Sequence, residues 1–166
     1  MANPTMSLIS SYTVGSGGAG TVVFSSLPST YTDLAIKVSA ANSAMYLKFN
    51  TDTNTGNNSA KILRSDYAVG VSSITNAVFG YYIFCGYSGA TSVFSSFDIY
   101  IPKYALSDIK TVSIDSFAEG NSTDEWSTLI AGAWNQTSAI NQITFDGGGG
   151  TFAQYSTFYL YGIKNS

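Results

Sequence analysis

Hydrophobic and polar residues alternate over short stretches of this chain, a pattern typical of β-strands with one buried face. In residues 34–41 every second residue is apolar, from Leu34 to Ala40. Residues 45–50 repeat the pattern, with the apolar residues at 45, 47 and 49. Only residues 42–44 separate the two stretches, so we expect them to pair as a hairpin.

Ten stretches have the length and composition of strands, and short turn-forming segments separate them. They are Leu8–Val14, Thr21–Ser26, Leu34–Ala41, Met45–Asn50, Phe79–Cys85, Val93–Ile101, Ile109–Ala118, Trp126–Asn135, Ile140–Asp146 and Thr157–Ile163. Residues 61–71 fit either a short strand or a helical turn. The pattern predicts an all-β fold: an antiparallel, jelly-roll-like β-sandwich of about ten strands with no substantial helix. Residues 1–6 are expected to form a flexible arm, and residues 7–166 a single domain.

The last predicted strand, residues 157–163, has large apolar side chains on both faces. Phe158 and Leu160 point to one side, together with Gly162. The other side carries Tyr159, Tyr161 and Ile163. We therefore expect this strand inside a sheet or at a subunit contact, covered by a second sheet, a partner chain, or both.

Charged residues make up only 10% of the 166 residues, against about 25% in typical domains. Ser, Thr, Asn, Gln and Tyr must supply the polar surface, which suits contacts with other proteins but is also usual in soluble β-proteins. The net charge is −3, and the seven cationic residues are scattered, so nucleic-acid binding is not expected. The apolar runs are too short to span a membrane, and residues 1–8 do not resemble a signal peptide.

Few residues could carry chemistry. The chain has no histidine, which excludes the usual catalytic triads and zinc sites. Cys85 lies in an apolar run and is predicted to be a buried, inert thiol. Asp98 is an acid inside a predicted strand, and we expect it to face outward or to be hydrogen-bonded near a sheet edge. The sequence therefore predicts a protein that is not an enzyme and has no cofactor.

Two polar segments could bind ions. Residues 52–58 (DTNTGNN) alternate oxygen-bearing side chains like a calcium loop, but they have one carboxylate and no closing Glu, so an Asx-rich turn is expected and no metal. Residues 119–125 (EGNSTDE) form the one acidic cluster. We interpret this cluster as a solvated hairpin tip, with ion binding or contact with a basic partner as the alternative.

The aromatic residues leave two interpretations open. Trp126 and Trp134 are an even number of residues apart and could share one face of a strand. Tyr81, Tyr82 and Tyr87 form a second group. Such residues stack on sugars, but they more often pack in cores and interfaces.

Two segments carry a resemblance to a known family. They are residues 24–34 (FSSLPSTYTDL) and residues 152–164 (FAQYSTFYLYGIK), supported by residues 49–52 (FNTD) and 132–143 (GAWNQTSAINQI). With these segments the chain resembles small virion proteins of tailed phages, which are β-sandwich capsid decoration, or cement, proteins with some relatives in tails.

The resemblance implies a non-enzymatic protein on the capsid exterior of a virion. Its partners would be the major capsid protein and further copies of itself, as a dimer or trimer, with no nucleic acid or membrane. The aromatic pattern and the two-sided C-terminal strand, rather than the resemblance, provide the proposed interaction residues, which are Trp126, Trp134, Tyr159, Tyr161 and Ile163. The alternative is a tail-associated or carbohydrate-binding β-sandwich module.

Overall fold

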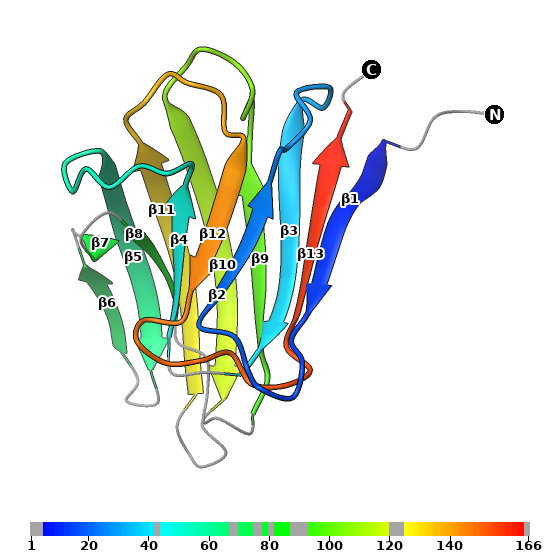
Figure 1. Cartoon of the computed structure of the whole chain (residues 1–166). Coiled ribbons are helices and arrows are strands. Elements are labelled where there is room, and N and C mark those ends of the chain that lie inside the picture. Colours follow the sequence, from blue (N-terminus) through cyan, green and yellow to red (C-terminus); the bar gives the residue numbers. More distant parts are fainter. Residues whose placement is uncertain are drawn as a thin grey trace.

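The computed structural model describes residues 5–41, 44–66, 70–74, 78–79, 82–86, 93–119 and 125–164. Two antiparallel sheets pack face to face across one hydrophobic core (Figure 1). The strands are β1 (Met6–Thr13), β2 (Thr21–Ser25), β3 (Asp33–Ala40), β4 (Met45–Phe49), β5 (Asn58–Asp66), β6 (Gly70–Ile74), β7 (Val78–Phe79), β8 (Tyr82–Gly86), β9 (Ser95–Ile101), β10 (Lys110–Glu119), β11 (Glu125–Trp134), β12 (Gln142–Asp146) and β13 (Thr157–Ile163). Within these ranges there is no helix that could cross a membrane.

The sheet order is that of a jelly roll with added strands. The large sheet runs β1-β13-β3-β9-β10-β11-β5-β6 and the small sheet runs β2-β12-β4-β8-β7. The strands β1-β13-β3-β9 of the large sheet face β2-β12-β4-β8 of the small one, and successive members mostly alternate between the sheets. Strands β5, β6, β10 and β11 widen the large sheet, and β7 adds to the small one. The predicted antiparallel sandwich is confirmed, with more strands than expected.

The expected hairpin of residues 34–41 and 45–50 is wrong. Strand β3 pairs with β13 and β9 in the large sheet, whereas β4 pairs with β12 and β8 in the small sheet. Both strands do bury the predicted apolar faces, but they face each other across the core instead of lying side by side. Alternation determines which face is buried, and it does not determine the neighbouring strand.

The middle of the chain is more regular than its sequence indicates. Residues 61–71, left open between strand and helical turn, fall mostly in β5, which continues to Asp66, and in β6, which begins at Gly70. β5 also takes in Asn58, the last residue of the expected Asx-rich turn. The single strand predicted at residues 79–85 is divided between β7 and β8.

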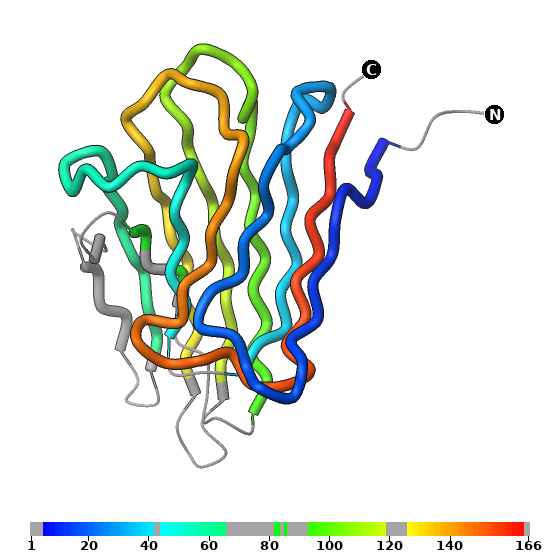
Figure 2. Tube along the Cα trace, in the orientation of Figure 1, coloured from blue at the N-terminus to red at the C-terminus, as the bar shows by residue number. Residues whose placement is uncertain are grey.

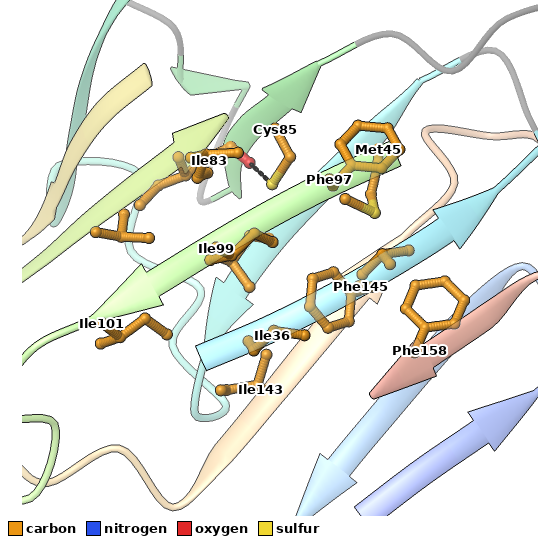
Figure 3. Close-up of a cluster of buried hydrophobic side chains, with 14 of the residues drawn as sticks. Ile36, Met45, Ile83, Cys85, Phe97, Ile99, Ile101, Ile143, Phe145 and Phe158 are labelled. Carbon is orange, nitrogen blue, oxygen red and sulfur yellow. Dashed lines mark hydrogen bonds between the residues drawn. The ribbon is translucent and has the colours of Figure 1, made fainter. Parts of the chain in front are cut away.

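The core is filled by side chains from both sheets (Figure 3). Phe145 of the small sheet packs against Phe158 of the large sheet, with ring centroids 5.3 Å apart.

Cys85 is completely buried, and its thiol lies 3.6 Å from the Ile83 carbonyl oxygen, to which it donates a weak hydrogen bond. Burial raises the pKa of this thiol far above its ordinary value, because the thiolate would lose its solvation. The predicted inert role of Cys85 agrees with this environment.

The segments that carry the family resemblance contact one another in pairs. Residues 24–34 meet the C-terminal segment where the Tyr31 ring packs on Gly162 and the Thr32 amide donates to the Ile163 carbonyl over 2.8 Å. Residues 49–52 meet residues 132–143 through the Asn50 side chain, which accepts from the Asn141 amide and donates to the Ala139 carbonyl. These short motifs therefore have structural roles in joining distant parts of the chain.

Asp33, in the first of these segments, anchors a loop of the large sheet. Its carboxylate accepts from the Tyr100 hydroxyl at 2.8 Å and from the Lys103 amide at 2.9 Å. The hydrogen bond to Asp33 raises the pKa of Tyr100, and burial and the carboxylate charge add to the effect. Asp33 thus fixes the turn that follows β9.

The two ends of the described chain lie side by side at one end of the large sheet (Figure 2). Met6 pairs with Ile163, and the Lys164 amide donates to the Thr5 carbonyl over 2.9 Å. The expected arm of residues 1–6 is therefore wrong for Thr5 and Met6, because backbone pairing with β13 holds both of them. Residues 1–4 lie outside the described residues.

Candidate binding surface on the large sheet

The predicted interaction residue Trp134 belongs to the core. Its side chain is 2% exposed and its ring lies 5.8 Å from that of Phe49. The indole nitrogen donates to Asp52 Oδ2 over 2.6 Å. Trp126 shares the inward face of β11, as the spacing predicted, and is half-buried. The two tryptophans therefore do not form an exposed platform for a sugar.

The calcium-like loop is an Asx turn, as the sequence predicted. The Asp52 carboxylate accepts from the Asn54 amide, the Asn57 side chain and the Trp134 indole. Partial burial raises the pKa of Asp52, but the hydrogen bonds from Asn57, Trp134 and Asn54 outweigh it and lower the pKa overall. Among the described residues no group of three or more acidic or cysteine side chains could hold a metal ion.

Other predicted aromatic and acidic positions are only partly described. Residues 120–124 of the acidic cluster, and Tyr81 and Tyr87, lie outside the described residues. Tyr82 is half-buried on the small sheet, where its ring lies 6.4 Å from that of Tyr46. The Lys48 ammonium stands 5.4 Å from the centre of the Tyr82 ring.

The outer face of the large sheet, which points away from the core, is organised in rows that run across the strands. Residues paired directly in an antiparallel sheet share a face, so the register defines each row. One row contains Tyr159, Lys37, Asp98, Asp115, Leu129 and Leu63. The next row contains Thr157, Ser39, Ser96, Phe117, Ser127 and Ser65. Large side chains thus stand beside a row of small hydroxyl side chains interrupted only by Phe117.

A hollow of about 520 Å³ lies where the two rows cross β13, β3, β9 and β10. Tyr159 and Phe117 flank it, and Ser39, Ser96 and Thr157 contribute hydroxyl groups. The residues of the two rows come together because strands that are mostly far apart in the sequence pair with one another. Sequence analysis singled out Tyr159 and Asp98, but it had no means of placing them in one hollow. We refer to this feature as the central hollow.

The charged groups of the central hollow are a lysine and two aspartates. Lys37 forms a salt bridge with Asp98, and Asp98 lies directly opposite Asp115 on β10. The outward orientation predicted for Asp98 is confirmed, since its side chain is 53% exposed. Asp115 is also exposed. Neither carboxyl lies in an apolar pocket of the kind that holds the acid catalyst of a glycosidase.

A second feature, the terminal patch, lies at the edge of the same face. Met6 pairs with Ile163, and Leu8 pairs with Tyr161, so the four side chains are neighbours. Met6 is 40% and Leu8 is 55% exposed, while Tyr161 and Ile163 are half-buried. The outward face of β13 is therefore not covered by the second sheet, in contrast to its inward face. Sequence analysis identified Tyr161 and Ile163. It missed Met6, which it assigned to an arm, and it placed Leu8 in a strand without a means of predicting its pairing with Tyr161.

A search of protein-family models, of curated proteins and of solved structures finds no match to this chain.

Proposed function

We propose that this chain is a structural protein of a tailed-phage virion, namely a capsid decoration protein that binds the assembled shell and stabilises it. The observation that carries the proposal is the terminal patch, a group of four neighbouring and largely apolar side chains at the sheet edge where both ends of the described chain lie. Such a patch fits a protein partner, because contact cores are apolar and depleted of charge. Its partners would be the major capsid protein and copies of the chain itself.

Two further properties support the proposal. The chain carries few charges, so its hydroxyl-rich surface is cheaper to desolvate than one covered with Lys and Glu. The jelly roll is a fold shared by many capsid-associated and lectin domains, and here its two sheets enclose one large core. Many copies seated on a symmetric shell would hold firmly even if each contact were weak.

The first experiment compares phage particles that contain the chain with particles produced by a phage whose gene for the chain has been deleted. A protein that binds only the assembled shell stabilises that shell, so the complete particles should withstand higher temperature and stronger osmotic shock. Equal resistance of the two kinds of particle would refute the decoration role.

The second experiment tests the terminal patch. Purified chain is added back to the deleted particles, and bound chain is measured after sedimentation. The Leu8→Glu variant should bind much less, because it places a charge in the apolar contact. Leu63→Glu is the matched control: Leu63 is 46% exposed on the same face but lies on β5, far along the sheet from β1. Equal binding of the two variants would exclude the terminal patch as the attachment surface.

A further inference from the structure

The central hollow is a different surface from the terminal patch, and its chemistry differs as well. The terminal patch is apolar, whereas the hollow combines hydroxyl groups, carboxylates and an ammonium group with two exposed aromatic rings. Its volume of about 520 Å³ lies within the range of about 300–1,000 Å³ usual for small-ligand sites. We propose that the central hollow binds a short neutral oligosaccharide.

The positions of the aromatic rings favour an elongated ligand. Tyr159 lies on β13 and Phe117 on β10, and two strands, β3 and β9, separate them. Neighbouring strands are about 4.8 Å apart, so the rings stand roughly 14 Å apart across the sheet. The apolar face of one sugar ring can stack on Tyr159 while another reaches Phe117. Tyr159 is 38% and Phe117 is 48% exposed, so part of each ring is accessible to a ligand.

The polar groups between the rings match the hydroxyl groups of a sugar. Ser39, Ser96 and Thr157 each donate and accept hydrogen bonds, and the carboxylates of Asp98 and Asp115 accept from sugar hydroxyls. The salt bridge with Lys37 holds Asp98 in place from the neighbouring strand. Because β3 and β9 are hydrogen-bonded to strands on both sides, ligand binding requires little ordering of the backbone that carries these groups.

The charge of the hollow selects against acidic ligands. Two carboxylates and one ammonium group leave it net negative, so phosphorylated or sialylated glycans would be repelled. A peptide that binds by adding a strand needs a free sheet edge, and the hollow lies on a sheet face where the backbone is already paired. A neutral glycan is the ligand class that fits both constraints.

The experiment is a titration of the full chain with cellotriose, maltotriose, N,N′-diacetylchitobiose and sialyllactose, followed by calorimetry and by saturation-transfer NMR. Lactose is titrated as well, as the neutral counterpart of sialyllactose. At least one neutral sugar should bind at millimolar or lower concentration, and sialyllactose should bind more weakly than lactose. Tyr159→Ala and Phe117→Ala should each reduce the affinity about tenfold, because each removes one stacking surface. Asp115→Asn tests the hydrogen-bonding part of the site and should weaken binding less than Asp115→Ala.

Tyr12→Ala is the matched control for Tyr159→Ala. Tyr12 is exposed to a similar degree, 43%, but its pairing with Phe158 puts it on the opposite face of the sheet. This variant should bind sugar like the unmodified chain, and all variants should show unchanged circular dichroism. Absence of binding to every neutral sugar, a preference for sialyllactose, or unaltered affinity in the two aromatic variants would each overturn the proposal. None of these outcomes bears on attachment to particles, which depends on the terminal patch.

Discussion

At the scale of single residues, Gly162 has almost no room for a side chain. A Cβ atom added there would overlap the Tyr31 ring, which packs flat against the glycine. We expect Gly162→Ala to lower the free energy of unfolding by about 1–3 kcal/mol, the usual cost of overpacking a filled site. Urea unfolding followed by tryptophan fluorescence measures the change. Gly15→Ala is the control, because nothing lies within 4 Å of its added Cβ atom.

A double variant shows whether overlap with the Tyr31 ring causes the loss of stability expected for Gly162→Ala. In a Tyr31→Ala background the ring is gone, so the further change Gly162→Ala should cost much less than it does alone. Additive effects of the two substitutions would mean that the glycine is needed for another reason.

For the tryptophans of β11, the spacing predicted that the two side chains share a face but not whether that face points inward. The even spacing of Trp126 and Trp134 correctly placed both on one side of β11, and the structure turns that side toward the core. A spacing of two is the same for a buried face and an exposed one, so the choice depends on the rest of the sandwich. The inert environment of Cys85 was easier to predict, because apolar residues surround it on both sides in the sequence itself.

At the scale of elements, β13 joins the edge strand β1 to the rest of the large sheet, and we expect the stability of the fold to depend on it. It lies between β1 and β3, and its inward side chains Phe158 and Leu160 are completely buried. Leu160→Ala should lower the free energy of unfolding by about 2–5 kcal/mol, because it opens a cavity in the core. Tyr159→Ala, one residue away on the outward face, should change it by less than about 1 kcal/mol. Denaturant unfolding of the two variants measures the contrast, and equal losses would contradict the assignment of faces.

Removal of residues 157–166 is the stronger form of the same test. Deleting β13 leaves β1 without its partner and exposes one edge of β3, so we expect insoluble or unfolded protein. A soluble truncated chain that melts cooperatively would show that the strand is dispensable.

The existence of most elements could be predicted, but their pairing could not. Alternation identified β3 and β4 with nearly correct bounds, yet their apparent hairpin is a crossing between sheets. Short polar connections are used both for hairpins and for crossings, so connection length does not distinguish them. The central hollow was beyond sequence analysis for the same reason, because Lys37, Asp98 and Asp115 become neighbours only through long-range pairing.

At the scale of the whole molecule, low charge determines how the chain should respond to salt. Only 10% of its residues are charged and the terminal patch is apolar, so attachment to particles should depend little on ionic attraction. At about 1 M salt the Debye length falls to about 3 Å, which removes most attraction between exposed charges. We therefore expect the chain to stay bound to particles when NaCl is raised from about 0.1 M to about 1 M. Sedimentation of particles with bound chain measures this, and release at high salt would mean that the contact is ionic and lies elsewhere than the terminal patch.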